Sequence, residues 1–101
     1  KFNLKLEKLN LIIKSNKIQP IFITQAMFNG LEDKRFFLIN NELKNFASEN
    51  NYFLIPLDEM TVFNKDDFFD PIHTTPKGSK KIADSIFPQL YSYLVSQNVF
   101  N

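Results

Sequence analysis

The only histidine in the sequence, His73, follows Asp70 by three residues. One loop can hold two side chains at this spacing as a hydrogen-bonded pair, in which the carboxylate fixes the tautomer of the imidazole and stabilises its protonated form. Such a pair can act as a general base with its orienting carboxylate. Pro71, between the two residues, is expected to stiffen the loop. The alternative is a loop histidine whose acidic neighbour is accidental.

The loop that carries this pair is predicted to lead directly into a helix. Thr75 offers a hydroxyl at the N-cap and Pro76 takes the first helical position, and both choices are favoured at a helix start. Gly78 lies in the first turn, where glycine costs about 1 kcal/mol relative to alanine. We therefore expect this turn to approach another backbone closely. Pro88 predicts a kink or break near residues 85–87. The predicted buried face of this helix consists of Ile82, Ala83, Ile86, Leu90 and Leu94.

Apolar periodicity predicts two further helices upstream. Residues 1 to about 15 and residues 33–50 each carry apolar side chains at the 3.6-residue spacing. Asp33 is the expected N-cap of the second of these helices. The apolar positions are Phe2, Leu6, Leu9, Ile12 and Ile13 in the first helix, and Phe36, Ile39, Leu43, Phe46 and Ala47 in the second.

Two short apolar runs, residues 21–24 and 52–55, are typical of strands buried on both faces, because they are β-branched and aromatic without polar alternation. A turn is expected at residues 29–30, and residues 58–74 are predicted to be mostly polar loop. The order helix, strand, helix, strand, helix predicts parallel strands in an α/β layered fold. Two buried strands cannot form a well-covered sheet alone, so further strands are expected from elsewhere.

Composition excludes several classes of protein. The 101 residues suffice for one domain or part of one, and a net charge of +1 argues against a nucleic-acid binder. The absence of cysteine excludes disulfide scaffolds, Cys-ligated zinc and thiol catalysis. Asp66 and Asp67 beside Asp70 and His73 form only a weak metal pattern, so no metal is expected. No apolar run is long enough to span a membrane.

The residues of this loop and helix start resemble a known family. Asp70-Pro71-Ile72-His73, followed by Thr74, Gly78, Ile82 and Ala83, is similar to the last conserved block of the SGNH (GDSL-type) hydrolases. The order of elements upstream resembles the family more weakly. The resemblance implies a three-layer flavodoxin-like α/β fold with a parallel sheet. Residues 1–101 would then be the C-terminal helix-strand-helix-strand-helix portion of a single domain.

The same resemblance implies a serine esterase or acyltransferase that acts on carboxylic esters, such as an O-acetylated carbohydrate or a lipid, and needs no cofactor. His73 resembles the family's general base, and Asp70 resembles the carboxylate that orients it. The nucleophile does not carry over, because the chain contains no Gly-Asp-Ser sequence and its serines lie on or beside predicted helices. The family's oxyanion-hole glycine and asparagine blocks are also absent, and Asn29-Gly30 follows the wrong strand.

We therefore expect the nucleophilic serine upstream of this chain, whose first residue is Lys1 and not Met. The chain alone is expected to be inactive and to need the N-terminal part of its own domain. The alternative is a non-catalytic α/β interaction module in which Asp70 and His73 are remnants of an ancestral site.

Three other groups of residues have a functional and a structural interpretation. Thr24 and Gln25 could line a substrate pocket, although burial or loop capping is the favoured explanation. The lysines at the start of the last helix are expected to form a solvated face. The phenylalanines near the loop could wall an acyl or sugar pocket, although packing the loop onto the core is the more common use. These two sets are Lys77, Lys80 and Lys81, and Phe63, Phe68 and Phe69.

Overall fold

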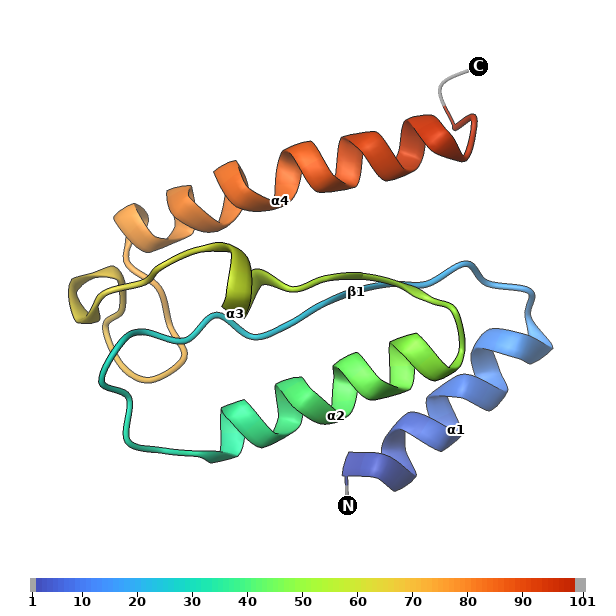
Figure 1. Ribbon diagram of the computed structural model, residues 1–101, viewed down its shortest axis with the longest axis horizontal. Coiled ribbons are helices and arrows are strands. Elements are labelled where there is room, and N and C mark those ends of the chain that lie inside the picture. The colour runs from blue at the N-terminus through green and yellow to red at the C-terminus, as the bar shows by residue number, and fades with distance from the viewer. Residues whose placement is uncertain (1, 100–101) are drawn as a thin grey trace.

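The computed structural model describes residues 2–99, and the predicted helical residue Lys1 lies outside that range (Figure 1). The elements are α1 (Phe2–Ser15), β1 (Ile21–Ile23), α2 (Arg35–Glu49), β2 (Phe53–Ile55), α3 (Leu57–Met60), the 3-10 helix η1 (Lys65–Asp67) and α4 (Pro76–Ser96). The predicted order of the three long helices and two strands is confirmed.

The two strands form a parallel pair, with Ile21 opposite Phe53 and Ile23 opposite Ile55. The chain between them returns through α2, as a parallel connection requires. The mixed α/β class with a parallel sheet is therefore confirmed. The turn predicted at residues 29–30 is also present, and Gly30 adopts a φ of +89° there.

The helices cover the two faces of the sheet in separate layers (Figure 1). On one face, Phe22 of β1 contacts Phe46 of α2, with ring centroids 5.8 Å apart. On the other face, Tyr93 of α4 stacks on Phe53 of β2, with centroids 4.0 Å apart. α1 packs beside α2. The strands therefore lie between α4 and the α1–α2 layer.

The prediction that both strands are buried on both faces is wrong for β1. Ile21 and Ile23 remain 36% and 40% exposed, whereas Ile55 of β2 is fully buried. Alternate residues of a strand face opposite sides of a sheet, so Ile21 and Ile23 share the face covered by α4. Since α4 packs on β2, this part of β1 is left open.

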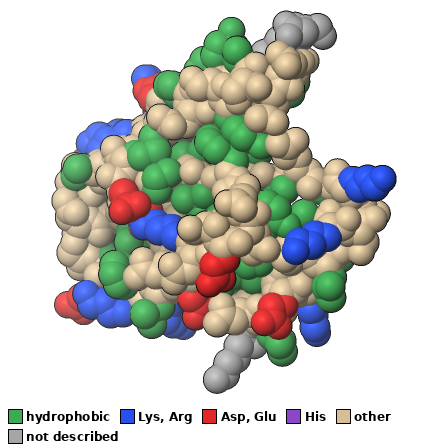
Figure 2. Space-filling view, turned by 45° about the vertical axis from the view of Figure 1, so that its right-hand side comes forward, with side chains coloured by type: hydrophobic (Ala, Val, Ile, Leu, Met, Phe, Trp, Pro, Cys, Tyr) green, Lys and Arg blue, Asp and Glu red, His purple; other side chains and the backbone are tan. Residues whose placement is uncertain are grey.

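The predicted helical faces are also narrower than the apolar pattern suggests. Leu6 and Ile13 of α1 are buried, but Leu9 and Ile12 are exposed. Ala83 of α4 is exposed as well. Each helix contacts a neighbour along only part of its apolar stripe, and the rest of the stripe meets solvent. Hydrophobic side chains consequently remain visible on the surface shown in Figure 2.

Residues 58–74 are mostly loop, as predicted, although they include η1, most of α3 and a bridge between Phe63 and Phe28. Two other local predictions need correction. Of the kink or break predicted near residues 85–87, the break is absent, because α4 runs from Pro76 to Ser96 with Pro88 inside it. Asp33 is not the N-cap of α2, a position that Lys34 occupies, although its carboxylate accepts the backbone N–H of Arg35 at 2.9 Å.

A small cluster of buried residues anchors the segment before α4. It consists of Ala26, Leu57, Phe63 and Phe68, with Phe28, Ile82 and Ile86 packed against it. This cluster fixes the chain just before Asp70 onto the core and onto α4. None of the helices within residues 2–99 combines the length and apolar character required to cross a membrane.

Candidate functional site

The structure brings Asp70 and His73 together as the sequence predicts. Asp70 Oδ2 lies 2.7 Å from Nδ1 of His73. Asp70 Oδ1 accepts the backbone N–H groups of His73 at 2.7 Å and of Ile72 at 2.9 Å. The carboxylate thus fixes both the imidazole and the backbone that carries it.

Hydrogen bonds hold Asp70 in its ionised form. The N–H groups of Ile72 and His73 and the His73 ring lower the pKa of the Asp70 carboxyl below its usual value. An ionised carboxylate accepts the proton on Nδ1 of His73, which leaves Nε2 as the basic nitrogen of the neutral ring. The His73 side chain is 70% exposed. Nε2 can therefore be reached by a reacting group from outside.

A short antiparallel arrangement, here called the loop hairpin (residues 67–75), holds the pair. At its inner end the Thr75 N–H donates to the carbonyl of Asp67 at 2.9 Å. Phe68 and Thr74 then form a bridge. At the outer end the Phe69 N–H donates to the His73 carbonyl at 2.8 Å.

The start of α4 packs directly against the inner end of the loop hairpin. Thr75 is the N-cap, and its Oγ1 accepts the Gly78 N–H at 3.2 Å, as predicted. A Cβ at Gly78 would lie 2.1 Å from the carbonyl oxygen of Asp67. The close backbone approach expected at this glycine is therefore confirmed.

The prediction that Lys81 belongs to a solvated face is wrong, and its ion pair with Asp67 was not predicted. The Asp67 side chain is fully buried and accepts Nζ of Lys81 at 2.7 Å. Lys77 and Lys80 instead pair with the exposed carboxylates of Asp66 and Asp84, in keeping with a solvated face. Lys81 is a lysine close to Lys77 and Lys80 in the sequence. Only its position on a different face of the helix could have distinguished it from them.

The other predicted groups have structural roles. Thr24 is buried, and its Oγ1 donates to Oδ1 of Asp58 at 2.7 Å. The Gln25 backbone N–H donates to the buried Asn40 side chain at 2.8 Å. These bonds fit the favoured interpretation of burial and capping. Phe63 and Phe68 are buried in the core cluster, while Phe69 is 75% exposed beside the Asp70–His73 pair.

No hydrogen bond within residues 2–99 joins a serine to the His73 ring. Ser79 is the serine nearest to His73 in the sequence, and its hydroxyl bonds that of Thr74 at 2.7 Å. Ser85 bonds the Lys81 carbonyl at 2.8 Å. Within residues 2–99, the Asp70–His73 pair is therefore not hydrogen-bonded to a serine hydroxyl.

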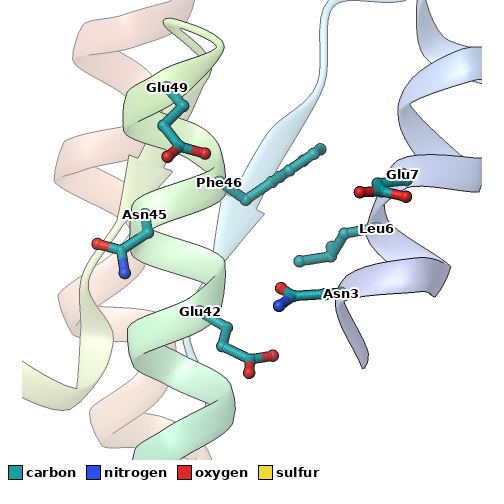
Figure 3. A pocket seen from close by; sticks show the side chains of 7 residues that line it. All are labelled: Asn3, Leu6, Glu7, Glu42, Asn45, Phe46 and Glu49. Carbon is teal, nitrogen blue, oxygen red and sulfur yellow. The ribbon is translucent and has the colours of Figure 1, made fainter. Parts of the chain in front are cut away.

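A separate pocket of about 340 Å³ opens between α1 and α2 (Figure 3). Three carboxylates, those of Glu7, Glu42 and Glu49, surround it. Across residues 2–99, no group of three His, Asp or Glu side chains is arranged to hold a metal ion. This pocket lies in the α1–α2 layer, whereas the Asp70–His73 pair lies in the loop that leads into α4.

No protein-family model, curated protein or solved structure matches the chain. The identification of the site therefore depends on its residues and their geometry.

Proposed function

We propose that this chain supplies the general base and orienting carboxylate of an SGNH-type serine esterase or acyltransferase. The observation that supports this proposal is the 2.7 Å contact between Asp70 Oδ2 and His73 Nδ1 in an exposed loop. The nucleophilic serine of the proposed enzyme lies outside the 101 residues. Its substrates are carboxylic esters, such as O-acetylated carbohydrates or lipid esters.

In the proposed reaction, Nε2 of His73 removes the proton from the serine hydroxyl as the serine oxygen bonds to the ester carbonyl carbon. Asp70 stabilises the imidazolium that forms and holds it in place. The imidazolium then gives its proton to the leaving alcohol as the ester bond breaks. In the second half, His73 deprotonates water or another hydroxyl as its oxygen bonds to the acyl carbon, and the imidazolium returns this proton to the serine oxygen as the acyl–serine bond breaks. This chemistry uses no cofactor.

The observed architecture supports the proposed fold. A helix layer on each face of a parallel pair of strands is the arrangement found in a three-layer flavodoxin-like domain. The exposed Ile21 and Ile23 lie where further strands and their covering helices would bury them. We propose that residues 1–101 are the C-terminal portion of such a domain.

Labelling with a fluorophosphonate, which reacts with activated serines, tests this proposal. In the full-length protein that carries this chain, we expect stoichiometric labelling of one serine outside the 101 residues. His73→Ala should abolish this labelling, because the serine then lacks its base. Ile72→Ala, an exposed change in the same loop, is the matched control and should label normally.

The 101-residue chain alone should remain unlabelled. Labelling of one of its own serines would contradict the proposed position of the nucleophile. A full-length protein that is not labelled would favour the non-catalytic interaction module.

A further inference from the structure

Asp67 is a second carboxylate close to the Asp70–His73 pair in the sequence. Unlike that exposed pair, Asp67 is buried. Its side chain is fully buried where η1 meets α4. Oδ2 accepts the backbone N–H of Asn64 at 2.8 Å and Nζ of Lys81 at 2.7 Å. Oδ1 is buried without a hydrogen-bond partner, with Nζ of Lys77 4.0 Å away. The Asn64 N–H and the Lys81 ammonium lower the pKa of Asp67, so the buried group is ionised.

Lys81 connects this carboxylate to several parts of the structure. Besides Asp67, its Nζ donates to the carbonyl of Val62 at 3.3 Å and lies 5.9 Å from the centroid of the Phe63 ring. One ammonium on α4 therefore holds both the chain before η1 and the side chain at its end. This ion pair resists separation, because breaking it leaves the charge of the buried Asp67 carboxylate uncompensated.

Because Asp67 belongs to the loop hairpin, its ion pair with Lys81 can affect the geometry of the Asp70–His73 pair. Asp67 occupies the inner end of the hairpin, and the Asp70–His73 pair occupies the outer end. The outer pair is exposed to solvent, so burial cannot hold its geometry. The inner end is attached to α4 through the Asp67 side chain and through the packing of its carbonyl against Gly78.

We propose that the Asp67–Lys81 ion pair positions the catalytic base: it ties the loop hairpin to α4 and thereby keeps Asp70 on Nδ1 of His73. Asp67 and Lys81 touch neither substrate nor nucleophile in this account and act through His73. The catalytic importance of this positioning rests on the proposed esterase function, whereas its effect on the imidazole does not.

NMR allows a direct test. The sequence contains one histidine, so the ring signals of His73 do not overlap with those of another histidine. Nitrogen-15 NMR at alkaline pH, where imidazole is neutral, reports which ring nitrogen carries the proton. In the wild-type chain we expect His73 to be mainly the Nδ1–H tautomer. Asp67→Asn should lower this tautomer fraction toward the value in Asp70→Asn. It should also speed the hydrogen exchange of the Phe69 and His73 amides about tenfold or more, as expected when local opening becomes easier.

Lys80→Met is the matched control, since it removes a lysine of α4 that forms an exposed pair with Asp84 and not with Asp67. It should leave the tautomer and the amide exchange unchanged. Lys81→Arg should retain wild-type values, because arginine can still pair with the carboxylate. If Asp67→Asn does not fold, Lys81→Gln provides the same comparison. Wild-type tautomer fraction and wild-type exchange in the folded Asp67 or Lys81 variant would overturn the proposal.

Ester hydrolysis by the full-length protein separates this inference from the proposed function. A positioning role predicts that Asp67→Asn lowers kcat about tenfold or more with little change in KM, since the base is misplaced while substrate binding is retained. A tautomer change in a protein without esterase activity would contradict the enzymatic function and leave the positioning of His73 supported.

Discussion

His73 of the candidate site has its partner, Asp70, in the same loop, whereas the buried Asn40 has its partner far away along the chain. The Asp70–His73 pair follows from a three-residue spacing in one loop, and the close approach at Gly78 follows from a glycine where alanine is favoured. Asn40 is buried, and its side chain hydrogen-bonds the backbone of Gln25, fifteen residues away in the sequence. Since both residue types are common at exposed positions, neither carries a local signal of this contact.

Asn40 provides the residue-scale prediction. Its Oδ1 accepts the Gln25 N–H at 2.8 Å, and its Nδ2 donates to the Gln25 carbonyl at 2.9 Å. Asn40→Ala leaves both backbone groups without partners, so we expect the free energy of unfolding to fall by about 2 kcal/mol. Urea denaturation measures this change. Asn45→Ala, at an exposed position of the same helix, should change it far less, and equal effects would contradict the proposed role of Asn40.

Among elements, the type and order were predictable from periodicity, but the extent of burial was not. The apolar runs that form β1 and β2 are equivalent in the sequence, yet β1 stays partly exposed because α4 packs on β2. Proline is disfavoured in the interior of a helix, yet α4 continues through Pro88. Burial and helix continuity depend on the tertiary contacts of each element. These contacts cannot be inferred from the residues of the element alone.

The junction between the loop hairpin and α4 provides the element-scale prediction. Gly78→Ala should lower the free energy of unfolding by about 1–3 kcal/mol, although alanine has the higher helix propensity. The physical reason is the 2.1 Å separation between the added Cβ and the Asp67 carbonyl oxygen, which forces the backbones apart.

Urea denaturation of Gly78→Ala, with Lys80→Ala in the same helix turn as the control, measures this cost. A Gly78→Ala chain as stable as the wild type would show that the α4 start does not press on the loop hairpin.

At the scale of the whole molecule, the layers are open on one side. The Cα radius of gyration is 14.9 Å and the shortest dimension is 17 Å. A compact domain of this length has a radius of gyration of about 13 Å. The expectation that the sheet needs further strands agrees with the exposure of Ile21 and Ile23. The sequence alone could not locate this open side, because both strands are equally apolar.

We propose that His73, oriented by Asp70, is the general base of an esterase. Steady-state hydrolysis of p-nitrophenyl acetate by the full-length protein that carries this chain tests this role of His73. His73→Ala should reduce kcat/KM by about 10³-fold or more, because the serine nucleophile loses its proton acceptor. The control Ile72→Ala should stay within about tenfold of the wild type, since its exposed side chain touches no reacting group in this account. Hydrolysis by the His73→Ala protein at near the wild-type rate would contradict the claim.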